Sequence, residues 1–432
     1  MKKFLYISYY YPPIQSIASM RSWKLAKYIR EFGWEPIVLA SASDSQSWGS
    51  PLPDVRVGRL ENSLFLERTS KKTKKQLTHS DTPFPNPGWS ASLKNTGYMT
   101  ARWIKRALRE AFAYPDDYAD WGKKALLHGR EILAKEKVDL ILSTAEPFTS
   151  HIIASTLSKE TGIPWIADYR DLWTQNHVAR HTKLRLFFER RLESSIVKNA
   201  SAVITTSEPL ALMLGSFLQK EVHTITNGFD PEDYVLPVKT DSIFSLIYTG
   251  VIYEKKQNAT AVLDAINILL KKKEIEAGKF KLRFFGSNAQ HLAQLLKEKG
   301  IDDLVHIHNT ISFQECVQKQ KAAAALLFLN WNDLKEKGLF SGKIFEYLAA
   351  RRPILAFPRN PGSVVDQLLE QTRAGVLCDT PEAIAAVLKE WYDAFYFDGN
   401  LTYQGIEEEI DKYSRKNQAQ EFAILFDAVT RK

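Results

Sequence analysis

Short apolar runs alternate with longer amphipathic segments along most of the chain. The runs are rich in Val, Ile, Leu and aromatic residues and end at turn residues, which is typical of buried strands, whereas the segments between them repeat apolar residues every three or four positions, as helices do. This alternation predicts parallel α/β sheets. The expected strands cover residues 4–8, 36–40, 55–57, 138–143, 165–168, 202–206 and 222–225 in the first half, and 245–249, 281–286, 305–307, 324–329, 354–357 and 375–378 in the second.

The strands form two groups, of about seven and about six, which predicts two doubly wound, Rossmann-like parallel-sheet domains. Turn residues cluster at 227–237, between the two groups. We therefore assign residues 1–235 to an N-terminal domain, 236–404 to a C-terminal domain, and 405–432 to a final helix that packs back on the N-terminal domain. Ligands of open parallel sheets bind beyond the carboxyl ends of the strands, so a cleft between the domains is the expected place for chemistry.

The segment 64–120 interrupts the alternation with an insert that is basic and aromatic. Within it, residues 101–112 have helical spacing, with Arg102, Lys105 and Arg109 on one side and Trp103 on the other. This pattern is typical of a helix on a membrane surface. It equally fits an ordinary surface helix whose apolar stripe packs on the sheet.

Composition narrows the class of protein without naming it. The chain has 432 residues, 44% of them hydrophobic, and its 58 Lys and Arg against 50 Asp and Glu give a net charge of +8. These values exclude disordered and fibrous proteins, and the mild excess of basic residues favours an anionic partner. Cys316 and Cys378 are too few for a disulfide framework or a four-thiolate zinc site, so a reducing, cytoplasmic location is expected. We expect neither a signal peptide nor a membrane-spanning segment, and hence at most peripheral contact with a membrane.

Several common enzyme classes lack their motifs here. The loop after the first strand has none of the glycines of a dinucleotide-binding fingerprint, and no P-loop, His-Glu-x-x-His or Gly-x-Ser-x-Gly occurs. Nicotinamide oxidoreductases, P-loop kinases and common hydrolases are therefore disfavoured. The basic residues are scattered and no recognition motif appears, so a nucleic-acid binder is also a poor fit.

Separated segments, taken in order, resemble the family-four retaining glycosyltransferases of the GT-B fold. They include Tyr10-Tyr11-Pro12-Pro13 with Arg21 and the run Asp168-Tyr169-Arg170-Asp171. The run 168–171 is part of a longer segment, 162–173, and the remaining segments are 33–36, 115–116 with Trp121, 143–147, 227–230 and 343–350.

The resemblance implies a two-domain enzyme that moves a hexose or related sugar from a UDP- or GDP-linked donor to a glycan or lipid-linked acceptor, with retention of configuration and without a metal or other cofactor. Its N-terminal domain would bind the acceptor and its C-terminal domain the sugar nucleotide. It also implies a role in bacterial surface-polysaccharide synthesis, in the cytoplasm or on the cytoplasmic face of the membrane. No Asp-x-Asp stands at a strand end to hold a divalent ion, in line with this expectation.

The loop at 338–342, which opens a predicted helix, is the expected donor site. Free amides and the positive end of the helix dipole attract phosphate or sugar oxygens there. Glu346, one turn into the helix, is expected to accept hydrogen bonds from the ribose hydroxyls. From the residues alone, a solvent-facing carboxylate is an equal alternative. Gly338 replaces a Glu that the family often carries there, so Lys343 or Glu336 is expected to take its place. The predicted donor-binding residues of this segment are Gly338, Leu339, Phe340, Ser341, Gly342, Lys343 and Glu346.

Positive charge is also needed to stabilise the departing nucleoside diphosphate. Gly250 follows an expected strand, and Lys255 and Lys256 come shortly after it. Gly250 and Lys255 are predicted to belong to the donor-binding residues. The resemblance assigns Lys256 to the diphosphate, although many relatives add an Arg that is absent here, so Arg21 or Lys343 is expected to contribute. A solvated surface lysine is the alternative for Lys256.

On the N-terminal side, Asp171 is expected to orient or deprotonate an acceptor hydroxyl, and Arg170 to contact the reaction centre. The alternative is an internal ion pair between these two side chains. Together with Lys256, they are the residues predicted to act in the transfer step. His151 is a weaker candidate, since an isolated histidine is commonly structural.

Two other functions stay open: a nucleotide-sugar epimerase of similar fold, which would need no acceptor, and a partner that binds a sugar nucleotide without chemistry.

Overall fold

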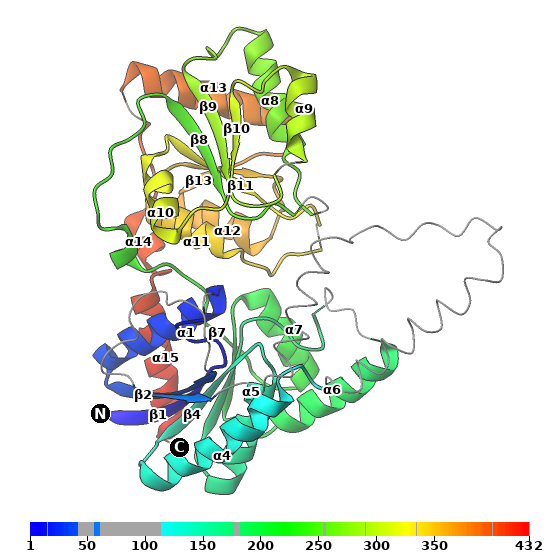
Figure 1. Ribbon diagram of the computed structural model, residues 1–432, viewed down its shortest axis with the longest axis vertical. Helices are drawn as coiled ribbons and strands as arrows, with labels where there is room; N and C mark the ends of the chain where they lie inside the picture. The colour runs from blue at the N-terminus through cyan, green and yellow to red at the C-terminus, as the bar shows by residue number, and fades with distance from the viewer. Residues whose placement is uncertain are drawn as a thin grey trace, which may run out of the picture. The chain divides into compact units, whose positions relative to one another are not determined.

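The computed structural model describes residues 1–14, 16–41, 56–60, 114–176, 182–253, 256–289, 291–333, 335–399 and 401–431. Residues 101–112 and Lys255 lie outside the described residues, as does most of the predicted 64–120 insert. The chain forms two compact units (Figure 1). Unit 1 contains Met1–Thr206, Ala211–Thr224 and Gln420–Lys432, and unit 2 contains Ser207–Leu210 and Ile225–Ala419. The main division thus falls between 224 and 225, ahead of the boundary expected at 235.

Unit 1 is built on a parallel sheet that, within the described residues, has seven strands in the order β3-β2-β1-β4-β5-β6-β7. The central strand β1 pairs with β2 on one side and with β4 on the other, and its residues from Phe4 to Ile7 have no exposed surface. A strand buried on both faces must be apolar at every position, which is why the continuous apolar run in the sequence predicts this strand. The strands are β1 (Lys2–Ile7), β2 (Trp34–Ser41), β3 (Arg56–Leu60), β4 (Leu140–Ala145), β5 (Trp165–Tyr169), β6 (Ala202–Thr205) and β7 (His223–Thr224).

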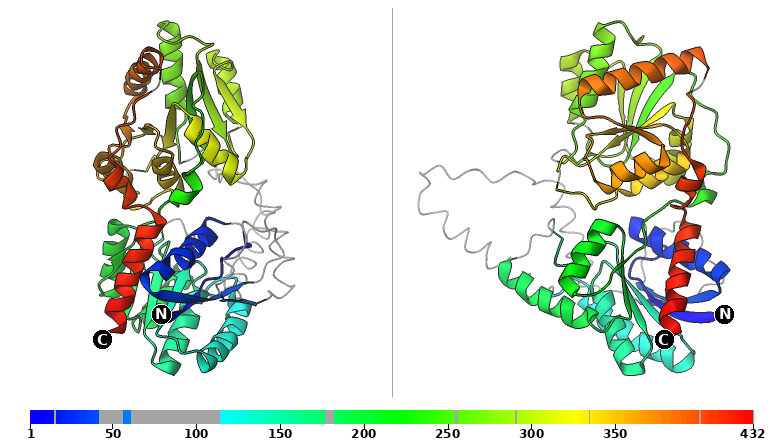
Figure 2. Two further views of the ribbon diagram at one scale, coloured as in Figure 1. Left: turned by 90° about the vertical axis from the view of Figure 1, so that its left-hand side faces the viewer. Right: turned by 180° about the vertical axis from the view of Figure 1, so that it is seen from behind.

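Helices cover both faces of this sheet (Figure 2). On one face, α1 and α15 meet β1, where the Tyr6 hydroxyl donates to Ser22 and the Phe4 ring lies 5.1 Å from the Phe426 ring. On the other face, α4 and α5 pack together and against the strands. The helices of unit 1 are α1 (Ile17–Tyr28), η1 (Ile29–Phe32), α4 (Ala119–Lys135), α5 (Thr149–Thr161), α6 (Lys183–Val197) and most of α7 (Glu208–Leu218).

Unit 2 holds the second parallel sheet, with six strands in the order β10-β9-β8-β11-β12-β13 among the described residues. Alternate residues of β8 serve two separate cores: Leu246 and Tyr248 pack with α8, α9 and α13, and Ile247 packs with α10, α11, α12 and α14. The strands are β8 (Phe244–Thr249), β9 (Phe280–Phe285), β10 (Val305–His308), β11 (Ala325–Leu329), β12 (Ile354–Phe357) and β13 (Gly375–Leu377). The helices are η2 (Pro231–Tyr234), α8 (Thr260–Lys271), α9 (Leu292–Lys299), α10 (Phe313–Ala322), α11 (Gly342–Ala350), α12 (Val364–Thr372), α13 (Pro381–Phe397) and α14 (Glu407–Asp411).

The expected strands of both groups are confirmed, and so is the doubly wound α/β class. The single final helix over 405–431 is wrong, because the chain forms α14 and then α15 (Arg415–Thr430). Between them, the Phe229 amide donates to the Tyr413 carbonyl at 3.0 Å, and the Arg415 amide donates to the Phe229 carbonyl at 2.7 Å. These bonds take up backbone groups that a continuous helix would use. The part of α15 from Gln420 onward belongs to unit 1. No helix in the described parts of the chain combines the length and the apolar character needed to cross a bilayer.

Candidate functional site

The loops after β8 and β9 lie side by side at the carboxyl end of the unit 2 sheet. The Gly250 amide donates to the Phe285 carbonyl at 2.7 Å, and the Ile252 amide to the Ser287 carbonyl at 3.3 Å. Gly250 and Gly286 both have positive φ, at 106° and 150°, and a Cβ on Gly286 would stand only 2.2 Å from the Gly250 carbonyl oxygen. Close backbone approach therefore requires glycine at 286.

Lys343, in the first turn of α11, reaches across this glycine pair. A Cβ on Gly250 would lie 3.3 Å from Lys343 Nζ. The ammonium donates to the Val251 carbonyl at 3.2 Å and to the Tyr248 hydroxyl, and it lies 4.1 Å from the centre of the Tyr248 ring. Burial lowers the pKa of Lys343 to about 8. The structure thus brings together two of the predicted donor-binding residues, Gly250 and Lys343.

Glu346 lies one turn further along α11 and is half-buried rather than facing solvent. Its Oε2 accepts a hydrogen bond from Gln320 Nε2 at 3.1 Å. Gln320, on α10, has no exposed surface, and its Nε2 also donates to Thr249 Oγ1 at 3.0 Å while its Oε1 accepts from the Tyr234 hydroxyl at 3.0 Å. Burial raises the pKa of Glu346. A neutral amide therefore holds this carboxylate in place, so its charge is not neutralised by that partner.

The start of α11 offers backbone donors next to these side chains. Ser341 occupies the cap position, but its hydroxyl makes no capping hydrogen bond to the helix. The first amides of the helix are thus not taken by that side chain, and the positive end of the helix dipole lies beside them. The Phe340 ring contacts Phe345 at 5.1 Å, so this side chain contributes packing. Leu339 in the preceding loop and Gly342, the first residue of α11, are half-buried.

Gly338 is buried against the start of α7, in the part of that helix that belongs to unit 2. Its carbonyl accepts a hydrogen bond from Ser207 Oγ at 2.6 Å. A Cβ at this position would come within 3.2 Å of carbon atoms of Pro209 and Leu210. Any larger residue, including the Glu that the resemblance leads one to expect, would crowd these neighbours, which is a physical reason for glycine here.

Lys256, on the loop after β8, has a partner that the sequence did not reveal. Its ammonium lies 4.3 Å from the centre of the Trp331 ring, which stacks on Tyr253 at 5.7 Å. The loop is fixed there because the Asn332 amide donates to the Lys256 carbonyl at 2.7 Å. Lys256 is half-buried over an indole and is not a freely solvated surface lysine.

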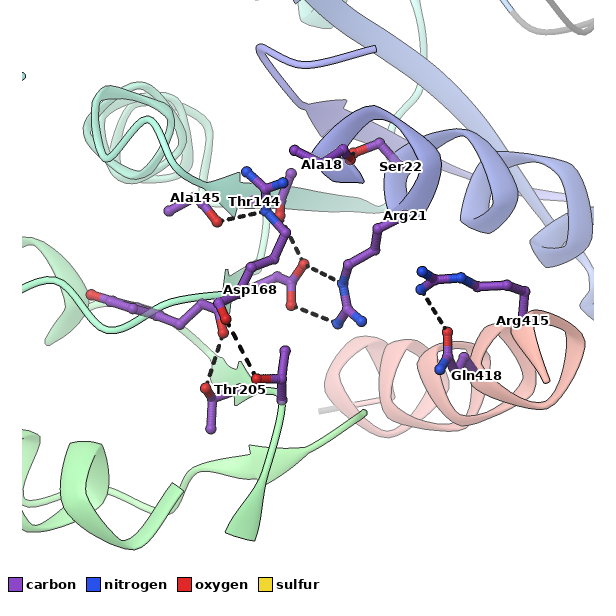
Figure 3. A network of polar contacts seen from close by, with 12 residues as sticks. Ala18, Arg21, Ser22, Thr144, Ala145, Asp168, Thr205, Arg415 and Gln418 are labelled. Atoms are coloured by element: carbon purple, nitrogen blue, oxygen red, sulfur yellow. Dashed lines mark hydrogen bonds and ion pairs between the residues drawn. The ribbon is translucent and has the colours of Figure 1, made fainter. Parts of the chain in front are cut away.

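In unit 1, Arg21 points from α1 to the end of β5 (Figure 3). Its Nη2 lies 3.0 Å from Asp168 Oδ1, and the side chains of the pair are 3% and 0% exposed. Thr144 Oγ1 donates to the second oxygen of Asp168 at 2.9 Å. Arg21 is expected from the sequence to contribute charge at the diphosphate, whereas the structure places it in unit 1 with its charge compensated by Asp168.

Arg170 and Asp171 follow the same strand but do not pair. Arg170 donates to the Ala145 carbonyl at 2.7 Å and to the Glu146 carbonyl at 2.5 Å. Among the described residues, no ion pair joins Arg170 to Asp171, so the internal pair considered above is not formed. The Asp171 side chain is exposed. The pKa of Glu146 is raised, first because Glu146 is buried and next because of the negative charge of Asp171.

His151 is part of the core of unit 1. It has no exposed surface, its Nδ1 lies 2.8 Å from Ser143 Oγ, and that hydroxyl accepts a hydrogen bond from Trp165 Nε1 at 2.7 Å. Burial lowers the pKa of His151 to about 3. A neutral, enclosed imidazole with these contacts is a structural residue.

The site in unit 2 contains residues that sequence reasoning did not single out. Gln320, Tyr248 and Tyr347 come from three elements, and the Tyr347 hydroxyl accepts from the Thr249 amide at 3.0 Å. Tyr347 lies within the segment 343–350 that carries the resemblance, whereas Gln320 and Tyr248 belong to no recognisable motif. The available signal was only that Tyr248 lies near the end of a largely apolar strand, whereas Gln320 lies in a polar helix with no signal of its own.

Two family models match the sequence, each over a different part of the chain. A model for "Glycosyl transferases group 1" matches residues 244–394, and a model for "Glycosyl transferase 4-like domain" matches residues 18–228. None of the curated proteins searched matches the sequence.

Solved structures of similar fold cover the chain almost from end to end. Sucrose-phosphate synthase from Thermosynechococcus elongatus has 14% identity and a TM-score of 0.57, with 100% of each chain covered. A lipopolysaccharide outer core galactosyltransferase has 13% identity and a TM-score of 0.54, covering 98% of this chain and 99% of its own. The N-terminal domain of a trehalose-6-phosphate phosphatase from Candida albicans has 12% identity and a TM-score of 0.56, covering 99% and 97%. At these identities the likeness shows the fold alone, and it confirms the two-domain class predicted from the sequence.

Proposed function

We propose that the chain moves a sugar from a UDP- or GDP-linked donor to a glycan or lipid-linked acceptor with retention of configuration. The premise is that it belongs to the group 1 glycosyltransferases and has the GT-B fold. Glycosyl transfer follows from the family. The donor, the acceptor and the stereochemistry are the proposal. An acceptor carried by a lipid would place the reaction at the cytoplasmic face of a membrane, in the synthesis of a surface polysaccharide.

One observation carries the proposal: Lys343 and the start of α11 meet the end of β8 at Gly250, with Glu346 one turn away. A sugar nucleotide offers a diphosphate and a ribose diol at a spacing of a few ångströms. The ammonium and the first amides of α11 suit the diphosphate, and the carboxylate suits the two ribose hydroxyls. Lys256, held on the same loop over Trp331, is the second candidate for the diphosphate.

In the transfer step, the bond between the anomeric carbon and the phosphate oxygen breaks and negative charge develops on the nucleoside diphosphate. Lys343 and the α11 amides stabilise that charge. The acceptor oxygen then bonds to the anomeric carbon on the face that the diphosphate leaves, and its proton passes to a base. Asp171, exposed after β5, is the proposed group for orienting or deprotonating the acceptor. Arg170, bonded to two carbonyls, is better suited to holding the 145–146 loop.

A panel of nucleotide sugars, screened by thermal shift on the full chain, tests the donor site. A ligand that binds only the folded protein raises the stability by RT ln(1 + [L]/Kd), so one donor should raise the melting temperature far more than the others. Glu346→Ala should abolish that rise while leaving the melting temperature of the free protein nearly unchanged. Glu390→Ala, which removes an exposed carboxylate on α13 of the same unit, is the matched control and should keep the full rise. An equal rise in all three proteins would remove Glu346 from the site.

The donor identified in this way then decides between transfer and the two other functions. Transfer releases nucleoside diphosphate and lengthens an added glycan. Conversion of the donor to an epimer without acceptor would contradict the proposal in favour of an epimerase. Binding without any turnover, across a panel of glycan and lipid-linked acceptors, would contradict it in favour of a non-catalytic partner.

A further inference from the structure

Helix α6 of unit 1 has its acidic residues inside and its aromatic residues outside. Glu189 and Glu193 have no exposed surface. Glu189 accepts from Arg185 Nε at 2.7 Å, and Glu193 accepts from Thr174 Oγ1 at 2.5 Å. Arg185 also donates to the Pro115 carbonyl at 2.9 Å, which ties the helix to the segment before α4. These bonds fix the rotation of α6 about its axis, and the opposite face must therefore point outward.

The outward face carries a stripe of large apolar side chains. Leu184, Phe187 and Phe188 are 69%, 49% and 52% exposed, and their spacing of three and four residues places them on one side of the helix. The two phenyl rings lie 5.5 Å apart, edge to face. In Figures 1 and 2, α6 runs along the outside of unit 1 with its N-terminal end directed away from the sheet. The helix that carries the stripe therefore lies at the periphery of unit 1.

Every exposed charge on this helix is positive. Lys183, Arg190 and Arg191 are exposed, while both carboxylates of α6 are buried. The Arg191 guanidinium lies 4.4 Å from the centre of the Phe187 ring, so charge and apolar surface are contiguous. A second copy of the helix would bring cations against cations, which opposes self-association. An anionic lipid surface meets both features, because the rings enter the boundary between headgroups and acyl chains and the cations approach the headgroup phosphates.

We propose that α6 is a membrane-docking helix that seats unit 1 on an anionic lipid bilayer through Leu184, Phe187 and Phe188, with Arg190 and Arg191 at the headgroups. The proposal stands on the burial and charge of α6 alone and does not depend on the transfer reaction. It is also separate from the membrane helix predicted over residues 101–112, which lies outside the described residues.

Flotation of the full chain with lipid vesicles tests this inference. The vesicles are phosphatidylcholine alone and phosphatidylcholine with about one third phosphatidylglycerol. We expect the protein to float with the mixed vesicles and not with the neutral ones. Phe187→Ser/Phe188→Ser should lower the vesicle-bound fraction at least about tenfold, since two rings no longer enter the bilayer. Arg190→Gln/Arg191→Gln should lower it several-fold at low salt and weaken its dependence on salt.

Phe397→Ser is the matched control, because Phe397 on α13 is 91% exposed but lies in unit 2. It should bind the mixed vesicles as the natural protein does, and all variants should keep the melting temperature of the natural protein. The proposal is overturned if the natural protein does not float with anionic vesicles, or if the double phenylalanine variant floats equally well, which would place lipid contact elsewhere in the chain. A dimer in sedimentation velocity that this variant abolishes would also overturn it, in favour of a second copy.

Discussion

The two units place charged residues at the same edge of a parallel sheet and use them differently. In unit 1, Arg21 and Asp168 pair directly at 3.0 Å in a fully enclosed position. In unit 2, Lys343 and Glu346 are each held by neutral partners, the hydroxyl of Tyr248 and the amide of Gln320. The first cluster is complete without a ligand. The second has charges that a ligand of complementary charge and hydrogen-bonding groups would satisfy.

The pKa shifts in unit 2 agree with this contrast. Burial lowers the pKa of Lys343 to about 8 and raises the pKa of Glu346, so each is shifted toward its neutral form. Such shifts mean that contacts within the protein do not fully replace the hydration that each charged group loses on burial. A diphosphate next to the ammonium would offset part of that cost, which is how a binding site differs from a structural ion pair.

The unit 1 pair gives the largest expected effect on stability. Asp168→Ala leaves the Arg21 guanidinium buried without its carboxylate, and breaking a buried pair in this way costs about 3–5 kcal/mol. Urea unfolding of the full chain measures the change. Asp171→Ala, three residues away but exposed, is the control and should change the free energy of unfolding by less than about 0.5 kcal/mol. If both variants lost equally little, the Arg21–Asp168 pair would not support unit 1, and Arg21 would again be available for another role.

Removing a charge from the unit 2 site should lower activity without lowering stability, the reverse of what is expected for the unit 1 pair. Lys343→Met removes an ammonium at the diphosphate and should lower kcat/KM by about 100- to 1000-fold, as loss of one preorganised charge stabiliser does. The free energy of unfolding should not fall, because an apolar chain of similar length replaces a poorly hydrated cation. Steady-state release of nucleoside diphosphate gives the first quantity, and urea unfolding gives the second.

Variants of two lysines on neighbouring loops serve as comparisons for Lys343→Met. Lys335→Met changes an exposed side chain and should leave both quantities unchanged. Lys256→Met measures how much the lysine over Trp331 contributes. A loss with Lys256→Met as large as with Lys343→Met would assign the diphosphate to both residues, and a loss confined to Lys256→Met would contradict the role of Lys343.

The contrast also explains what the sequence could reveal. The strands were predictable because sheets buried on both faces need unbroken apolar runs, as in β1. Lys343 and Glu346 were predictable because they share one helix turn, so their proximity follows from sequence spacing. Gln320 and Tyr248 come from other elements, and Arg21 is 147 positions from Asp168. No local pattern encodes such pairs.

The same reasoning applies to the break between α14 and α15. It arises from backbone hydrogen bonds to Phe229, far away in the chain, and the local sequence from 405 to 431 reads as helical throughout. Local periodicity therefore specified the elements, while the contacts between distant segments decided where one helix ended and which charges were compensated.

The pH dependence of donor binding gives the smallest expected effect and the most specific one for unit 2. With its pKa at about 8, Lys343 of the free protein loses its proton as the pH rises through this value. A bound diphosphate stabilises the ammonium, so its pKa in the complex is higher and binding takes up a proton. Donor affinity should therefore fall by up to about tenfold per pH unit as the pH rises above about 8.

The neighbours of Lys343 do not produce this profile between about pH 7 and 10. Burial raises the pKa of Cys316 to about 12 and raises the pKa of Tyr248 and Tyr347 above their ordinary value. Isothermal titration with the identified donor measures the affinity across the window. In Lys343→Met the affinity should be weaker and should not change with pH in this range. A profile that falls equally in the variant would mean that another group carries the dependence, and that the lysine of unit 2, like the arginine of unit 1, is satisfied within the protein.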